Sequence, residues 1–241
     1  MKVHGRTVFF SILLSASAAS AAMIPARKAA STSDGQVALG ALDAAPKSSV
    51  AEMESCHSSD PNRLCLAVKY AVFAEAGQAP SISSGQAAAA IRTVNGVWSK
   101  CNVAFQLENF AVVNPAGDGV RFNIGNYTEL DQVRTHYGSE KMLLVALTGA
   151  WDRKGSLGDS GANAWTSMPG GPPYGAVIEN TVGTFANIVG HELGHYLNLY
   201  HRPDTANLMN PIIYSASTAL TGEQCQTARD TAKSTWAAML R

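Results

Sequence analysis

Two histidines four positions apart, with a glutamate directly after the first, constrain this chain more than any other feature. They lie in the segment HELGH at residues 191–195, and His201 follows six positions after the second. Residues four apart share one face of an α-helix, so His191 and His195 can hold one metal ion. His201 would add a third nitrogen and leave a fourth coordination position open, as in catalytic zinc sites. Glu192 can reach a water at that position without being a ligand.

The spacing between His195 and His201 places a requirement on the chain between them. A continued helix would carry His201 to the side opposite His195, away from the metal. The helix therefore has to end, and the chain to reverse, at about Asn198. Glycine is the usual residue in the left-handed conformation that ends a helix, and asparagine is its commonest substitute. We expect Asn198 to make this turn at a small energetic cost relative to glycine.

A methionine follows this segment, within the sequence Asn-Leu-Met-Asn-Pro at 207–211. The combined pattern resembles the signature of the metzincin zinc endopeptidases, HExxHxxGxxH followed by a methionine-containing turn. The residues that match the signature one by one are His191, Glu192, His195, His201 and Met209. Asn198 stands where the family has glycine. The resemblance implies a matrixin-like metalloprotease with one catalytic Zn²⁺ that acts on proteins or peptides.

The resemblance also implies how such a site would work. Zinc held by the three histidines would bring the pKa of its bound water to roughly neutrality and would polarise the scissile carbonyl. Glu192 would take a proton from that water and deliver it to the leaving amine. An extended substrate would pair antiparallel with the edge strand of the sheet.

A substrate pocket is expected next to the methionine turn. In matrix-type metzincins, the residues after this turn form the outer wall of the pocket for the side chain that follows the scissile bond. The corresponding residues here are Pro211, Ile212, Ile213 and Tyr214. We expect Val189 and Leu193, on the active-site helix, to line the near side. Because none of these residues is charged, the pattern predicts cleavage before medium or large apolar side chains.

Two other interpretations remain open on the sequence alone. In the other large class of zinc proteases the third ligand is a downstream glutamate, and Glu223 is the only nearby candidate. Alternatively, the chain is a secreted zinc-binding or adhesion module without activity. Glu192 argues against such a module, because a site that only stores metal has no need of a base.

The order of the expected elements indicates an α+β chain. Apolar and alternating runs predict strands at 64–73, 102–113, 142–147, 162–166 and 176–179. Helical spacing predicts helices at 81–99 (with Ser84 as N-cap), 129–137, 184–197 and 221–240. Residues 151–161, rich in Gly and Asp, are expected to form a loop. The resemblance implies a zincin-type fold with a mixed, mostly parallel sheet, an antiparallel edge strand at 162–166, and a small C-terminal subdomain after His201.

The first residues have the pattern of a targeting segment. A basic start, a short apolar run and small residues predict a signal peptide at 1–22. The composition of 23–50 predicts a disordered leader or short propeptide, which leaves 51–241 as one catalytic domain. We expect an exported monomer, extracellular or periplasmic. Zero net charge and 15% charged residues give no basic patch for nucleic acid, and no later segment suits a membrane span.

The cysteines are few and even in number. Four cysteines in an exported protein favour two disulfides, with three pairings to choose from. We favour the local pair Cys56–Cys65 and the long-range pair Cys101–Cys225. The alternative is that Cys56 blocks the zinc ion in a precursor, as a thiol does in matrix-type metzincins.

A second ion is a further candidate. Asp152 and Asp159 lie in the loop rich in glycine and aspartate. Oxygen ligands in a flexible loop are what Ca²⁺ takes in proteins, so these two residues are candidates for a structural calcium site.

Overall fold

The computed structural model describes Cys56 and residues 60–241, without the side chain of Asp159. The signal peptide expected at 1–22 and the leader expected at 23–50 lie outside these residues. No helix in the described part of the chain is both long and apolar enough to cross a membrane.

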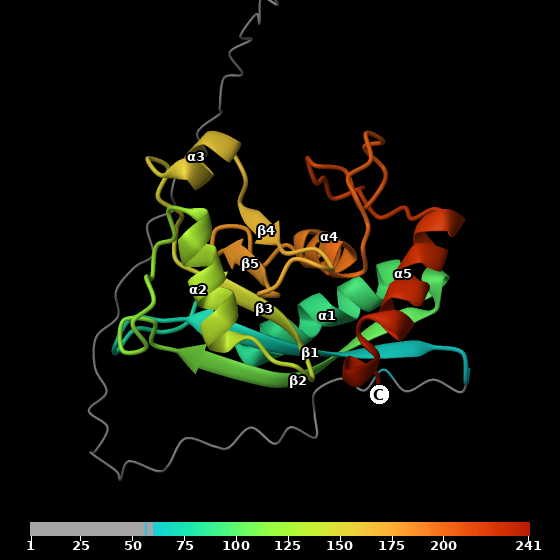
Figure 1. Cartoon of the computed structure of the whole chain (residues 1–241), viewed down its shortest axis with the longest axis horizontal. Helices are drawn as coiled ribbons and strands as arrows, with labels where there is room; N and C mark the ends of the chain where they lie inside the picture. The colour runs from blue at the N-terminus through green and yellow to red at the C-terminus, as the bar shows by residue number, and fades with distance from the viewer. Residues whose placement is uncertain (1–55, 57–59) are drawn as a thin grey trace, which may run out of the picture. The chain divides into compact units, whose positions relative to one another are not determined.

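Five strands form the sheet of the described part of the chain (Figure 1). They are β1 (Leu64–Phe73), β2 (Val103–Val113), β3 (Leu143–Thr148), β4 (Ala164–Thr166) and β5 (Ala176–Glu179). Their order across the sheet is β2-β1-β3-β5-β4. Neighbouring strands are parallel except β4, which pairs antiparallel with β5 at the edge. The fold is therefore α+β with a mixed, mostly parallel sheet and an antiparallel edge strand, as the sequence predicts.

Helices cover both faces of the sheet, which explains why its central strands are apolar on both sides. On one face, Leu66, Val68 and Tyr70 belong to a core shared with α1 (Ser84–Trp98) and α4 (Ala186–Tyr196). On the other face, Ala71 and Phe73 join a core shared with α2 (Tyr127–Tyr137). The sheet thus fixes α4, which carries the HELGH segment, against one of its faces.

The structure differs from the expected elements at the N-cap of α1 and in the loop expected at 151–161. The N-cap of α1 is Ser83 rather than Ser84: its backbone is extended, and its hydroxyl accepts a hydrogen bond from the backbone N–H of Gln86. Within the loop expected at 151–161, the chain forms a short helix, α3 (Ser156–Ser160). Gly161, at φ 66°, ends α3 in the left-handed conformation that glycine adopts without strain.

The prediction of one continuous helix over 221–240 is also wrong. Helix α5 spans Gly222–Ser234, and a separate 3-10 turn, η3, spans Ala237–Met239. Between them Trp236 is buried, and its indole N–H donates to the carbonyl of Tyr196 at 2.7 Å. This tertiary contact with the end of α4 draws the chain away from the helical path after Ser234.

One disulfide ties the C-terminal segment to the rest of the fold. Cys101, in η2 (Ser99–Cys101) directly after α1, is bonded to Cys225 in α5. Residues after His201 form a small C-terminal part, and their buried side chains Ala228 and Trp236 belong to the same core as α1 and α4. Figure 1 shows α5 beside α1.

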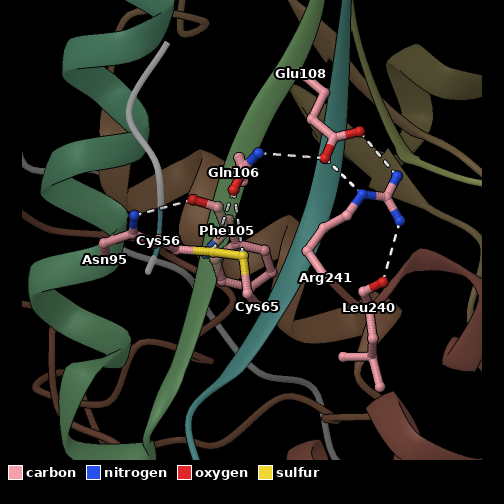
Figure 2. The surroundings of a disulfide bond; sticks show 8 residues. All are labelled: Cys56, Cys65, Asn95, Phe105, Gln106, Glu108, Leu240 and Arg241. Carbon is pink, nitrogen blue, oxygen red and sulfur yellow. Dashed lines mark hydrogen bonds and ion pairs between the residues drawn. A yellow bond between two sulfur atoms is a disulfide. The ribbon is translucent and has the colours of Figure 1, made fainter. Parts of the chain in front are cut away.

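The other disulfide joins Cys56 to Cys65 in β1, so Cys56 holds no free thiol for a metal. Figure 2 shows Gln106 of β2 beside this bond, with its amide directed to Glu108. Glu108 forms an ion pair with Arg241, whose backbone N–H donates to the carbonyl of Cys65 at 2.9 Å. Both disulfides have the pairing favoured on the sequence.

Candidate metal centre and cleft

Helix α4 presents two imidazoles on one face, and the chain returns a third beside them. The Nε2 atoms of His191 and His195 lie 3.0 Å apart, and those of His195 and His201 lie 3.2 Å apart. Nitrogens bound to one tetrahedral zinc at about 2.0–2.1 Å should lie roughly 3.3 Å from each other. The three side chains are therefore placed to bind one metal ion.

Backbone carbonyls orient the two helical histidines. The Nδ1 atom of His191 lies 2.8 Å from the carbonyl oxygen of Leu208, and that of His195 lies 2.8 Å from the carbonyl oxygen of Leu199. A carbonyl only accepts, so each Nδ1 carries the proton and each Nε2 keeps its lone pair for a metal. Both rings are held in the tautomer and direction that ligation requires.

The electrostatics of the cluster favour neutral imidazoles. Burial, with the neighbouring His195, lowers the pKa of His191 to about 3. Burial also lowers the pKa of His195 to about 4 and the pKa of His201 below its ordinary value. Neutral imidazole is the form that binds a metal, so the histidines do not have to lose a proton at neutral pH to do so.

The turn expected at Asn198 brings His201 back to the other two histidines. Asn198 has φ 62°, and its N–H donates to the carbonyl of His195 at 3.0 Å. The N–H of Leu199 donates to the carbonyl of Gly194, also at 3.0 Å. This pair of bonds is the Schellman arrangement, in which a left-handed residue ends a helix and satisfies its last carbonyls.

The methionine expected to support the site is entirely buried and packs against α4. A Cβ added at Gly194 would lie 2.5 Å from the sulfur of Met209, so the glycine makes room for this contact. The carbonyl of Leu208, the residue before Met209, accepts the hydrogen bond from His191. The turn thus supports the helix through packing and orients one ligand directly.

A buried amide pair holds this turn in place. The side-chain oxygen of Asn207 accepts from the N–H of Met209 at 2.9 Å. Its amide also exchanges hydrogen bonds with the amide of Gln224, at 2.9 and 3.0 Å. Sequence analysis did not identify Gln224, because no pattern links it to a partner 17 positions away.

Glu192 is buried beside the histidines and has a partner that the sequence did not reveal. Its Oε2 accepts a hydrogen bond from the hydroxyl of Thr166, on β4, at 2.6 Å. Burial raises the pKa of Glu192 to about 7, while the bond from Thr166 and the charge of Arg134 lower it. A carboxyl group in this range can accept and release a proton near neutral pH.

Arg134, from α2, is the second group that sequence analysis missed. Its side chain is only 4% exposed. The guanidinium donates to the carbonyl of Trp165 at 2.7 Å, to the carbonyl of Gly175 at 3.0 Å and to the carboxylate of Asp131 at 2.8 Å. An arginine on an amphipathic helix is normally solvent-exposed, so the sequence carries no signal for this buried position.

A cleft of about 910 Å³ runs past the histidines, with β4 along one side. Pro211, Ile212 and Ile213 are among the residues that line it. Tyr214 does not: it is 47% exposed and outside the lining, and its backbone carbonyl accepts a hydrogen bond from the side-chain amide of Asn187.

The two residues of α4 that were expected to line the cleft do not do so. Val189 and Leu193 are fully buried in the core, and Ile188 lines the cleft instead. Ile188 lies four positions before Glu192, so both occupy the open face of α4. Val189 and Leu193, one position further on, belong to the core that α4 shares with α1 and the sheet.

The alternative ligand Glu223 lies apart from the histidines. Its side chain is 89% exposed and pairs with Arg202 at 3.8 Å. Within the described residues, the group of three or more side chains that could hold one metal consists of His191, His195 and His201.

No observation supports the calcium site expected in the loop at 151–161. The carboxylate of Asp152 is exposed and accepts from the backbone N–H of Lys154, while the side chain of Asp159 lies outside the described residues. The loop is anchored instead by Glu179, which is buried and pairs with the guanidinium of Arg153. A protein cation thus occupies the position next to this buried carboxylate.

No family model and no curated protein matches this sequence. Among solved structures, the chain is similar to metalloproteinase-II from Bacteroides fragilis, with 13% sequence identity and a TM-score of 0.45. The match covers 72% of this chain and 59% of that protein, so the chain spans less than two thirds of its length. The functional interpretation therefore depends on the geometry of the site itself.

Proposed function

We propose that this chain is a secreted zinc endopeptidase of the metzincin type. The observation that carries the proposal is the convergence of three histidine Nε2 atoms on one point, within 4.8 Å of one another, beside a buried glutamate in an open cleft. Three neutral imidazoles with room for a further ligand are the donor set of catalytic zinc. A closed structural site would have a fourth protein ligand in place of the cleft.

A zinc ion at this position would polarise the scissile carbonyl and lower the pKa of its water to roughly neutrality. Glu192 would accept a proton from the attacking water and pass it to the leaving nitrogen as the peptide bond breaks. Thr166 donates to one carboxylate oxygen of Glu192, which leaves the other oxygen to face the water. The two side chains together would set the direction of proton transfer.

Strand β4 is an edge of the sheet that the described residues form, and this edge would be available to an extended substrate. The N–H of Glu179 donates to the carbonyl of Asn163, and hydrogen-bonded positions alternate along an antiparallel pair. By this alternation the backbone groups of Ala164 and Thr166 are directed away from β5, on the strand that lines the cleft. A peptide pairing with them would gain register from main-chain hydrogen bonds and selectivity from pockets.

The lining residues Pro211, Ile212 and Ile213 support a preference for apolar side chains after the cut. Burying such a side chain gains about 1.5–3 kcal/mol, whereas a charged one would lose several kcal/mol of hydration without a partner. We expect cleavage before Leu, Ile, Met, Phe or Tyr when cuts in a proteome-derived peptide library are profiled. A dominant Lys, Arg or Asp after the cut would contradict this assignment.

The decisive experiment is digestion of casein or gelatin by the purified protein, with and without a chelator. We expect cleavage that the chelator abolishes and that added zinc restores. Glu192→Ala should retain zinc and lose roughly 10²–10⁴-fold in rate, because a general base contributes that much. Glu223→Ala, which removes a glutamate exposed to solvent, is the control for this substitution and should cleave like wild type.

Each alternative interpretation predicts a different outcome in this experiment. If Glu192→Ala cleaves within about threefold of wild type, the role of the base is wrong. Loss of zinc in Glu223→Ala but not in His201→Ala would support the downstream-glutamate class. Stoichiometric zinc without cleavage of either protein substrate would support a non-enzymatic zinc-binding module.

Secretion is part of the same proposal. Both disulfides fit an oxidising compartment, where such bonds persist. We expect exported protein to lack residues 1–22, which N-terminal sequencing of material from the medium or periplasm would measure. Retention of Met1 in that material would contradict the signal peptide.

A further inference from the structure

We propose that Arg134 is a positioning residue of this site, which fixes strand β4 and, through Thr166 on that strand, the carboxylate of Glu192. The inference rests on the proposed function and deepens it. It assigns the orientation of the base to α2, an element on the opposite face of the sheet from the histidines.

The first observation is that the guanidinium of Arg134 is buried and hydrogen-bonded to several acceptors. Across the described residues, Arg134 is the only lysine or arginine that is buried. A buried charge is costly unless it is hydrogen-bonded, and this one donates to three acceptors within 3.0 Å. Two of these acceptors are backbone carbonyls, those of Trp165 and Gly175. Arg134 therefore binds strand β4 itself and the residue directly before β5.

The second observation is the tightness of this contact. A Cβ added at Gly175 would lie 2.7 Å from Cγ of Arg134 and 3.0 Å from Cδ2 of Leu144. The arginine stem is thus packed between β3 and the start of β5 and has little freedom to move. Its guanidinium can serve as a fixed reference for the carbonyls that it binds.

The third observation is the weakness of β4 on its own. The strand has three residues, Ala164–Thr166, and within the described part of the chain it pairs with β5 alone. Few ladder bonds hold so short an edge strand, so a charge-assisted bond to Trp165 contributes a large share of its positioning. Thr166 is the next residue, and its hydroxyl lies 2.6 Å from Glu192. A shift of the Trp165 carbonyl would move this hydroxyl and, with it, the carboxylate.

The expected consequence is a loss of turnover without a loss of metal. A misplacement of about 1 Å at a reacting group can cost about 10²-fold in rate. The zinc ligands His191 and His195 are oriented by Leu208 and Leu199, which do not depend on β4. We therefore expect Arg134→Gln to lower kcat at least tenfold while zinc content stays stoichiometric.

The experiment compares Arg134→Gln with Arg121→Gln in the full chain. Arg121 is a matched control, because its side chain is 59% exposed and pairs with Glu129 near the start of α2. Zinc content, kcat and KM on a peptide substrate, and amide hydrogen exchange of the metal-free protein are measured for each. Exchange at 162–168 should rise at least tenfold in Arg134→Gln and stay unchanged in Arg121→Gln, with β1 unchanged in both.

Thr166→Val tests the second of the two contacts, the hydrogen bond from Thr166 to Glu192. It should lower kcat and leave zinc content unchanged. In a double-mutant cycle, Arg134→Gln should cost much less in kcat when Thr166 is already Val, because the two act on the base in series. Independent, multiplicative losses would overturn the inference. Arg134→Lys, which keeps the stem and charge but has a single donor group, replaces the glutamine variant if that variant does not fold.

The outcomes separate this inference from the proposed function. If wild type shows no zinc-dependent cleavage, the proposed function fails, and the exchange measurement still decides whether Arg134 holds β4. If wild type cleaves but exchange at 162–168 does not respond to either Arg134 variant, the positioning role is wrong. Normal kcat with raised exchange would equally overturn the role in catalysis.

Discussion

The two sides of the cleft are held by different means. The ligand side, residues 186–211, has each helical histidine anchored to a backbone carbonyl at 2.8 Å and Met209 entirely buried. The edge side, Ala164–Thr166, is a three-residue strand whose Trp165 is 37% exposed. The three histidines are thus positioned by contacts within one segment of the chain, while strand β4 depends on contacts with distant segments. Damage on the ligand side should cost metal and stability, and damage on the edge side should cost turnover.

The largest expected effect comes from removing a ligand. His191→Ala should abolish cleavage and weaken zinc binding by more than the roughly 10–100-fold lost with a ligand's hydrogen-bond partner. Thr166→Ala, on the edge side, should keep wild-type zinc affinity. Competition with a chromophoric chelator measures both. Equal losses of affinity in the two variants would erase the distinction between the sides.

Removing each disulfide in turn tests how far the stability of the fold depends on a link that encloses both sides of the cleft. Cys101–Cys225 spans 124 positions and encloses both sides of the cleft, whereas Cys56–Cys65 spans 9 and encloses neither. Loop-closure entropy predicts that replacing both members of the long-range pair by alanine costs about 5 kcal/mol of unfolding free energy, against about 3 for the local pair. Urea unfolding of the two double variants checks the order, and a larger loss for the local pair would contradict it.

The buried methionine tests whether packing supports the ligand side. Met209→Ala should lower the free energy of unfolding by about 2–5 kcal/mol, because it leaves a cavity against α4. Met209→Leu, of similar volume, should cost less than about 1.5 kcal/mol. Trp165→Ala, at the exposed edge, should cost less than Met209→Ala in the same urea titration. The reverse order would mean that the edge side carries the stability.

The smallest expected effect is at the end of α4. Asn198→Gly should raise the free energy of unfolding by less than about 1 kcal/mol, because glycine adopts φ near 62° without a side-chain clash. Asn198→Val should lower it by about 1–2 kcal/mol. Thermal unfolding of the zinc-bound protein measures both. If Asn198→Val raised the free energy of unfolding, the left-handed conformation at residue 198 would not contribute to the stability of the ligand side.

Local patterns predicted the elements well where the residues themselves decide the structure. The strand at 64–73 and the reversal at Asn198 follow from apolar runs and turn chemistry, and both are present. The helix expected at 221–240 ends early because Trp236 turns inward to the carbonyl of Tyr196, a contact that no local pattern contains. Tyr214 lies outside the cleft lining, and the bond from Asn187 to its carbonyl is likewise a tertiary contact that no local pattern contains.

The sequence by itself determined the candidate ligands and base: two imidazoles and a carboxylate on one helix, a residue that can end that helix, and a third imidazole after the turn. These are local properties, because helix geometry relates residues four apart whatever the rest of the fold does. Only the tertiary structure decided what holds the carboxylate. Thr166 contacts Glu192 from 26 positions away along the chain, and Arg134 contacts Trp165 from 31 positions away. The strand order that brings these residues together is not written in any one segment. Buried polar groups must find partners wherever the fold brings them, and that depends on packing rather than on pattern.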